Sequence, residues 1–186
     1  GNVVAAARTA LGTRFPHFIP GHPIAGTEQS GVEASQAGLF RGRRVILTPL
    51  PETSTQALGR ARALWEATGA EVIEMSVEEH DRILAASSHL PHMLAYMLVD
   101  MLVRRDDHRA VFAASAGGLR DVTRIAASDP VMWRDICLAN REALLAVLAQ
   151  YRDELGTLMA AIERGDGKWL EDTFARAKRT RETLNE

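Results

Sequence analysis

Seven polar residues of the sequence could carry chemistry. His89 and His92 lie three residues apart at the start of an apolar stretch, and His22 lies with Glu28 in a glycine-rich segment. An imidazole can take up or release a proton near neutral pH. Arginine can hold a carboxylate through two parallel hydrogen bonds. The arginines and the aspartate after a Gly-Gly pair are Arg120, Asp121 and Arg124. Together these residue types predict a site that binds a small acidic molecule and moves a proton.

Simpler interpretations of the same residues remain open. The arginines could form ordinary ion pairs on a solvated helix face, and the paired histidines could be satisfied residues at a helix start. His89 and His92 with Glu28 or His22 have the residue types of a metal site, but no His-Glu-x-x-His framework is present. We therefore predict no metal. A nucleophilic serine is disfavoured, because none follows a strand on a tight turn into a helix.

Composition restricts the class of protein. The 186 residues carry a net charge of −2, which does not favour nucleic acid binding. One cysteine, Cys137, excludes an internal disulfide and is typical of the cytoplasm. Without a signal peptide or a long apolar run, we expect no membrane association. Because the sequence begins with Gly1 rather than methionine, we expect it to be part of a longer protein.

Residues 1–75 have the pattern of an α/β sheet. We predict strands at 18–20, 44–48 and 71–75, with a shaped loop over 21–31 because of its glycines. A Thr53-x-x-Gln56 capping box predicts the helix between the last two strands, which ends at Gly69. No Gly-x-Gly-x-x-Gly turn occurs, so we interpret 1–75 as the remnant of a nucleotide-binding domain whose cofactor-binding residues are unknown.

Residues 76–186 are predicted to be entirely helical, which makes the fold mainly α. Ser76-x-x-Glu79 caps a helix that continues to about residue 104, with a kink or a restart at Pro91. A loop is expected over 115–124. Ser128-Asp129-Pro130 opens a helix predicted to run unbroken to Glu163, and a last helix covers 168–181. Apolar residues on the central helix recur every three or four positions: Leu90, Met93, Leu94, Met97, Leu98, Met101 and Leu102. So much apolar helix surface predicts a homodimer.

Several segments, in order along the chain, carry a resemblance to a known family. The first is the glycine-rich segment 21–31, which contains Gly21-His22-Pro23-Ile24-Ala25-Gly26. Further ones are Ser88-His89-Leu90-Pro91-His92, Gly117-Gly118-Leu119-Arg120-Asp121-Val122-Thr123-Arg124 and Ser128-Asp129-Pro130-Val131-Met132-Trp133, followed by Asn140. This series resembles the prephenate dehydrogenase family.

The resemblance implies an activity and roles for individual residues. The family's enzymes oxidatively decarboxylate prephenate to 4-hydroxyphenylpyruvate in tyrosine biosynthesis, with hydride transfer to NAD or NADP. They join a Rossmann domain to a helical dimerisation domain. By resemblance His22 is the catalytic histidine and Arg124 binds a substrate carboxylate. His92 contacts the side-chain end of the substrate, where tyrosine can also bind as an inhibitor. The remaining residues that the resemblance places at the site are Ser88, His89, Glu28 as an ionic gate with Arg124, and Asp121 with Trp133 near the subunit boundary.

Two other functions stay open at this point. The substrate could be arogenate, which carries an amino group in place of the keto group. The chain could also be a non-enzymatic helical dimerisation module that senses tyrosine. Because the phosphate-binding turn of the family is absent, we expect this 186-residue chain to be inactive on its own, and the choice between NAD and NADP is undetermined.

Overall fold

The computed structural model describes residues 1–26 and 31–183. The chain divides into two compact units, Gly1–Leu144 and Leu145–Glu186, which are described separately below. Helices dominate both units, and a small sheet lies in the first, so the prediction of a mainly α chain with an α/β part is confirmed. No helix among the described residues is long and apolar enough to cross a membrane.

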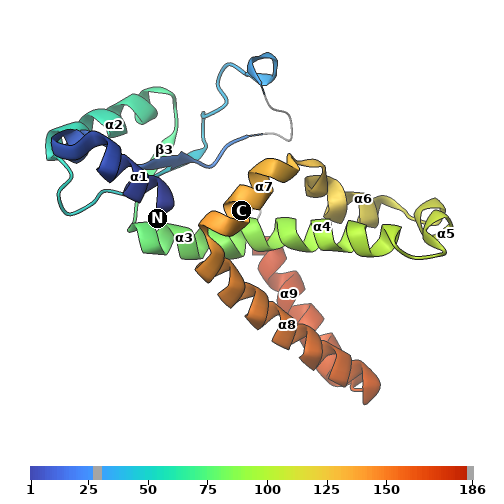
Figure 1. Cartoon of the computed structure of the whole chain (residues 1–186). Coiled ribbons are helices and arrows are strands. Elements are labelled where there is room, and N and C mark those ends of the chain that lie inside the picture. The colour runs from blue at the N-terminus through green and yellow to red at the C-terminus, as the bar shows by residue number, and fades with distance from the viewer. Residues whose placement is uncertain (27–30, 184–186) are drawn as a thin grey trace. The chain divides into compact units, whose positions relative to one another are not determined.

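The sheet of the first unit has the strand order β1-β2-β3, with β1 at Gly21–Pro23, β2 at Arg44–Leu47 and β3 at Glu71–Glu74. β2 pairs antiparallel with β1 and parallel with β3. Val45 and Leu47 of β2 are completely buried, because helix α2 (Thr55–Ala67) packs its Leu58, Ala61 and Trp65 against them. Figure 1 shows α2 lying beside β3. This packing is the core of the α/β part.

The first strand lies three residues later than the sequence predicts. Residues 18–20 are not a strand, and the strand begins inside the segment that we expected to be a loop. Gly21 allows a close approach there, since a Cβ on it would lie 3.0 Å from Cδ2 of Leu47 and would displace that side chain. Pro23 is tolerated because it ends the strand. The glycine therefore indicates a tight strand pair, and this pairing holds His22 opposite Ile46.

Short helical segments precede and follow the strands. Helix α1 (Asn2–Leu11) ends at Gly12, whose φ of 52° suits glycine, and the 3-10 turns η1 (Gly12–His17) and η2 (Val32–Ala34) follow. The predicted capping box of α2 is wrong by one residue. Ser54 is the cap and accepts a hydrogen bond from the amide of Ala57, whereas the hydroxyl of Thr53 accepts one from Leu50.

A nearly straight rod of helix spans the first unit (Figure 1). It consists of α3 (Val77–Leu84), a π-helical turn η3 (Ala85–His89) and α4 (Leu90–Val103). Ser76 caps α3 as predicted, through its hydroxyl and the amide of Glu79. Of the two outcomes predicted at Pro91, the restart is confirmed, because a new helix begins at Leu90 after the π-helical turn. Pro91 occupies the first turn of α4, where a missing N–H is tolerated, and the amide of Leu90 bonds back to Ala85 in the wider π register.

Shorter helices pack along α4. They are α5 (His108–Ala113), α6 (Gly117–Thr123), the 3-10 turn η4 (Arg124–Ala127) and α7 (Pro130–Ala139). The predicted loop over 115–124 is therefore wrong, because the Gly-Gly pair begins a helix. The Asp129 cap of α7 is confirmed, since its carboxylate accepts from the amides of Val131 and Met132. The hydroxyl of Tyr96 on α4 donates to the carbonyl of Ser128 and ties this layer to the rod.

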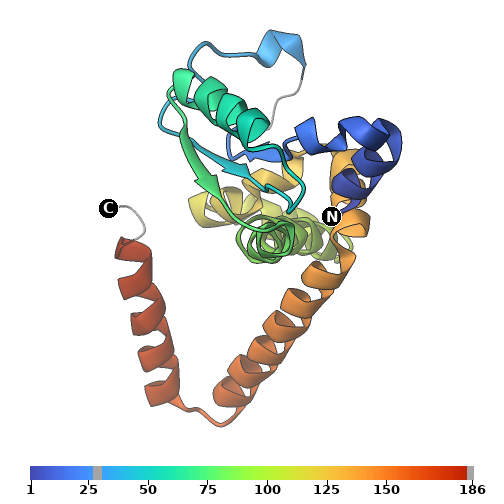
Figure 2. The same cartoon turned by 90° about the vertical axis from the view of Figure 1, so that its left-hand side faces the viewer.

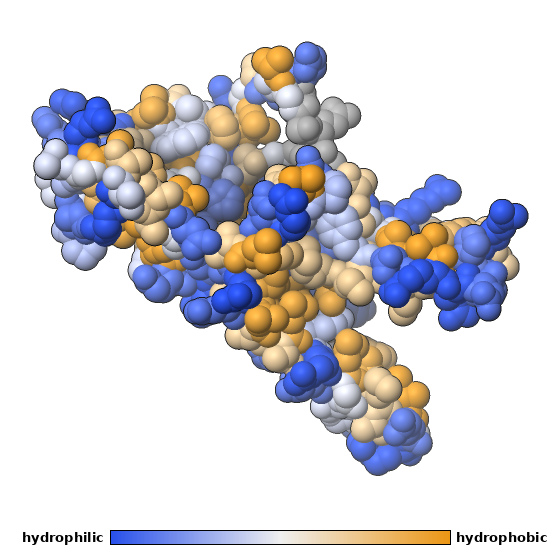
Figure 3. Space-filling view, viewed as in Figure 1, coloured by the Kyte–Doolittle hydropathy of each residue, from blue (hydrophilic) through white to orange (hydrophobic). Residues whose placement is uncertain are grey.

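The predicted helix from 130 to 163 is broken at Asn140, which has φ −110° and ψ 34° between α7 and α8 (Arg141–Glu163). In the second unit, α8 turns at Gly165 (φ 66°) into α9 (Gly167–Thr183), and Figure 2 shows the two as diverging arms. Apolar side chains follow α8 in Figure 3. The exposed ones include Leu155, Met159 and Ile162, so this helix carries an uncovered apolar stripe.

Candidate active site

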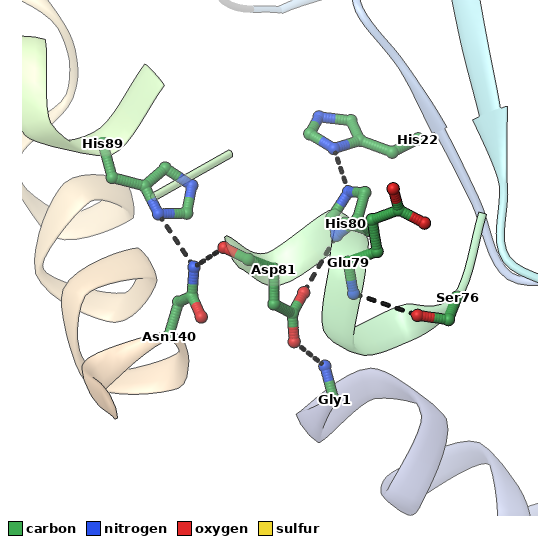
Figure 4. A network of polar contacts seen from close by, with 8 residues as sticks. All are labelled: Gly1, His22, Ser76, Glu79, His80, Asp81, His89 and Asn140. Atoms are coloured by element: carbon green, nitrogen blue, oxygen red, sulfur yellow. Dashed lines mark hydrogen bonds and ion pairs between the residues drawn. The ribbon is translucent and has the colours of Figure 1, made fainter. Parts of the chain in front are cut away.

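A chain of hydrogen-bonded side chains begins at His22 on β1. Its Nδ1 lies 2.9 Å from Nε2 of His80 on α3, and the Nδ1 of His80 lies 2.9 Å from Oδ1 of Asp81 (Figure 4). The other carboxylate oxygen of Asp81 lies 2.6 Å from the amino nitrogen of Gly1. The sheet therefore presents His22 to α3, and α3 holds it with two consecutive polar residues.

The protonation states of these hydrogen-bonded side chains follow from their surroundings. His22 is exposed on one side, yet desolvation on its packed side, assisted by the nearby His80, lowers its pKa. Burial alone would raise the pKa of Asp81, but in this 186-residue chain hydrogen bonds from the Gly1 amine and from His80 outweigh it and lower that pKa. At neutral pH His22 is thus a neutral imidazole and Asp81 a carboxylate.

Asn140 connects the same helix to a second histidine. Its Nδ2 donates to the backbone carbonyl of Asp81 at 2.8 Å and lies 3.2 Å from Nδ1 of His89 (Figure 4). An amide nitrogen only donates, so Nδ1 of His89 accepts and the proton of a neutral His89 ring lies on Nε2. Desolvation by burial, followed by nearby His22 and His80, lowers the pKa of His89. The break between α7 and α8 thus places a side chain that orients His89.

His92 is held by its ring face. It stacks on Trp133 of α7 with ring centroids 3.7 Å apart, and Trp133 also meets the ring of His89 edge-on at 6.0 Å. Nδ1 of His92 donates to the carbonyl of Ser88 at 2.8 Å. Ser88 therefore contributes its backbone, and the π-helical turn brings this carbonyl, His89 and His92 to one end of α4.

The structure brings together most of the predicted residues, although not all of them. Trp133 contacts both His89 and His92. Asn140 bonds to His89 and to the backbone of Asp81, and so connects His89 to the hydrogen-bonded side chains that begin at His22. Asp121 and Arg124 have exposed side chains on α6 and η4, which pack along α4. Glu28 lies outside the described residues, so the predicted gate between Glu28 and Arg124 stays a prediction.

Beside this cluster lies an open pocket of about 470 Å³. His22, His80 and Asp81 form one wall, and apolar groups of Phe18, Ile19 and Val77 are among those that form the rest. A pocket with a few convergent polar groups in an apolar lining is typical of small-molecule sites. Residues 1–26 and 31–183 contain no group of three His, Cys, Asp or Glu side chains placed to hold a metal ion.

Sequence reasoning missed His80 and Asp81. A signal was available, because Val77, His80, Asp81 and Leu84 share the inward face of α3 at spacings of three and four. Leu84 is buried there, and two polar residues on an otherwise apolar face are expected to be hydrogen-bonded. Their partner could not be read from the sequence, because His22 is 58 residues away.

Comparison with known proteins shows the family to which the chain belongs. Residues 2–74 match the family model described as the nucleotide-binding domain of prephenate dehydrogenase, and residues 76–176 match the one described as its dimerization domain. The chain belongs to the prephenate dehydrogenase family. It is 40% identical over 188 residues to the cyclohexadienyl dehydrogenase of Zymomonas mobilis, covering 99% of this chain and 64% of that protein. It is 38% identical to the prephenate dehydrogenase of Bacillus subtilis, covering 98% of this chain and 49% of that protein.

Solved structures of prephenate dehydrogenase relatives have the same fold. The Aquifex aeolicus enzyme, in complex with hydroxyphenyl propionate and NAD+, superposes with a TM-score of 0.91 at 39% identity, covering 99% of this chain and 64% of that one. The Synechocystis arogenate dehydrogenase superposes with a TM-score of 0.81 at 26% identity, covering 95% of this chain and 66% of that one. The chain thus spans about two thirds of these relatives and half of the Bacillus enzyme.

Proposed function

We propose that this chain is the substrate-binding part of a prephenate dehydrogenase, which oxidatively decarboxylates prephenate to 4-hydroxyphenylpyruvate in tyrosine biosynthesis. The observation that carries the proposal is the position of His22, which His80 holds at the wall of an open pocket. Burial lowers the pKa of His22, which favours the neutral imidazole. Family membership supports the dehydrogenase chemistry.

The reaction needs a group that accepts a proton. As hydride leaves the ring carbon that bears the hydroxyl, that oxygen acquires carbonyl character and its proton becomes acidic. A neutral imidazole at hydrogen-bond distance stabilises this transition state more than the ground state. Loss of the ring carboxylate as CO₂ then makes the ring aromatic, and the oxygen recovers a proton as a phenol. His22 is the catalytic residue in this proposal.

The remaining predicted residues would bind the substrate. Arg124 would hold a carboxylate through its guanidinium fork, with Glu28 as its gate. His92, oriented by the Ser88 carbonyl, and His89 would face the side-chain end, where tyrosine could bind as an inhibitor. Asp121 and Trp133 would lie near a subunit boundary.

The hydride acceptor is NAD or NADP in this proposal. The sequence has no Gly-x-Gly-x-x-Gly turn, so the residues present do not form a pyrophosphate site by themselves. We therefore assign residues 1–75 to part of a nucleotide-binding domain and residues 76–186 to a helical substrate-binding and dimerisation domain. The two family matches meet between residues 74 and 76, which supports this boundary. We expect a homodimer acting in the cytoplasm.

Arogenate is the alternative substrate, and the Synechocystis relative supports testing it. The test compares two proteins: the 186-residue chain, and the same chain preceded by the nucleotide-binding segment of its own gene. NAD and NADP are titrated by calorimetry, and NAD(P)H formation is followed with prephenate and with arogenate. We expect saturable cofactor binding and turnover from the longer protein alone. Turnover by the 186-residue chain would contradict the assignment of the cofactor site, and no turnover by either would contradict the function.

A further inference from the structure

We propose that His80 and Asp81 are positioning residues that fix the tautomer of His22, with its proton on Nδ1 and its Nε2 left as the acceptor. The catalytic meaning of this tautomer rests on the proposed function above, but the tautomer itself follows from the contacts alone. Both residues lie on α3, a different element from His22. His80 contacts the base and Asp81 contacts His80, so neither is placed on the reacting atoms.

The direction of each hydrogen bond follows from the one before it. An ionised carboxylate only accepts, so Asp81 takes a hydrogen from Nδ1 of His80 at 2.9 Å. A neutral His80 that carries its proton on Nδ1 has a lone pair on Nε2. That lone pair lies 2.9 Å from Nδ1 of His22, which must therefore donate. The neutral His22 ring then has its lone pair on Nε2.

This lone pair points away from His80. The two ring nitrogens of His22 lie on different sides of the ring, and Figure 4 shows the second one turned away from α3. His22 is an exposed residue that lines the open pocket, which leaves room for a substrate hydroxyl. The opposite tautomer would present an N–H there and could not accept a proton, so rings in that form would be inactive as a base.

The hydrogen bonds from His22 through His80 to Asp81 also stabilise the positive charge that develops on His22. When Nε2 takes up a proton, the imidazolium keeps its Nδ1–H bond to His80, and His80 stays bonded to the Asp81 carboxylate. A base held by a second group that is itself oriented by a carboxylate is a recurring arrangement in enzymes. Among the residues that the structure describes, His89 from η3 also interacts with His22, and the Gly1 amine of this 186-residue chain contacts Asp81.

Nitrogen-15 NMR of the histidine rings tests the tautomer in the 186-residue chain without any activity. At about pH 8 an imidazole is neutral, so the protonated ring nitrogen can be assigned by its shift. We expect the His22 proton on Nδ1 in the unmodified chain. His80→Phe removes the acceptor and should release His22 to a mixture of tautomers. His80→Gln restores an acceptor oxygen and should retain the Nδ1 proton, and His17→Gln, at an exposed histidine, is the matched control.

Two results would overturn the proposal: a His22 proton on Nε2 in the unmodified chain, or an unchanged His22 tautomer in a folded His80→Phe chain. Asp81→Asn provides an independent variant, because an amide can turn its NH₂ toward His80 and reverse the chain of bonds. We expect it to increase the Nε2-protonated form of His22, and an unchanged tautomer would count against the proposal.

A second arm uses the longer protein with its nucleotide-binding segment. His80→Phe should lower kcat by about tenfold or more, as loss of a histidine's orienting partner does at metal sites, with KM within a few-fold. His80→Gln should recover most of that loss. An unchanged kcat in His80→Phe would overturn the positioning role. If the tautomer is as expected but His22→Asn leaves turnover intact, the proposed function fails while the tautomer assignment stands.

Discussion

The indole ring of Trp133 lies almost parallel to the imidazole ring of His92, with an angle of 21° between the planes. Trp133 is 6% exposed, and its ring N–H is buried without a hydrogen-bond partner among the described residues. The contact is therefore one of ring faces and depends on flat area rather than on a polar bond. It joins α7 to the first turn of α4 at the point where His92 is proposed to meet the substrate.

Two substitutions of Trp133 should distinguish the contribution of its flat ring from that of its ring N–H group. Trp133→Phe keeps a flat ring and loses an N–H that has no partner, so we expect a modest loss of stability and a KM within a few-fold. Trp133→Ala should cost roughly 3–5 kcal/mol, the usual penalty for truncating a buried aromatic residue. Urea unfolding measures the loss of stability in each variant, and steady-state kinetics of the longer protein measures KM. Equal effects of both variants would show that the ring face has no role.

Much of the fold was predictable because local chemistry determined it. Ser76, Asp129 and Gly12 end or begin helices as their side chains and backbone freedom require. The errors have a common cause in tertiary contact. Gly21 is a glycine because of Leu47 on another strand, and Asn140 interrupts a periodic helix because its side chain bonds to Asp81 and His89. Neither partner is close in sequence.

Substitution of His22 tests the proposed base. His22→Asn keeps a polar side chain that cannot accept the proton at neutral pH. In the longer protein it should lower kcat by about 10²–10⁴-fold, leave KM within a few-fold and abolish the acidic limb of the pH–rate profile. His17→Asn, at an exposed histidine, is the control and should change neither constant. A raised KM with an unchanged kcat profile would make His22 a binding residue instead.

Stability of the 186-residue chain should depend on pH through two histidines. The folded-state pKa values of His22 and His89 are both lowered. Below their ordinary value of about 6.5 the unfolded chain therefore binds more protons than the folded chain. The free energy of unfolding should be independent of these groups above that pH and should fall as the pH drops through the window below it. Urea midpoints between about pH 5 and 8 measure this, and His22→Asn or His89→Asn should flatten the dependence. A midpoint that rises toward acid would contradict the lowered pKa values.

Arg124 is predicted to act in binding rather than in proton transfer. Arg124→Gln removes the charged fork that would hold a substrate carboxylate, so KM for prephenate should rise strongly, while kcat changes less. Arg109→Gln, which removes an exposed cation from α5, is the matched control and should leave KM unchanged. A lower kcat at constant KM would assign Arg124 to the transition state instead.

The uncovered apolar stripe of α8 is predicted to bury itself in a second copy of the chain. Leu155, Met159 and Ile162 recur at spacings of four and three and are 42%, 60% and 60% exposed. Large apolar faces of this kind are typical of obligate homodimers, and the matching of residues 76–176 to a dimerization domain agrees with this. Sedimentation of the 186-residue chain at micromolar concentration should give a dimer. Met159→Glu places a negative charge in the stripe and should shift the chain toward monomer. Thr157→Glu adds the same charge at an exposed position on the opposite face of α8 and should not. A folded monomer in the unmodified chain would contradict the dimer, and dissociation by both variants would point to charge rather than to the stripe.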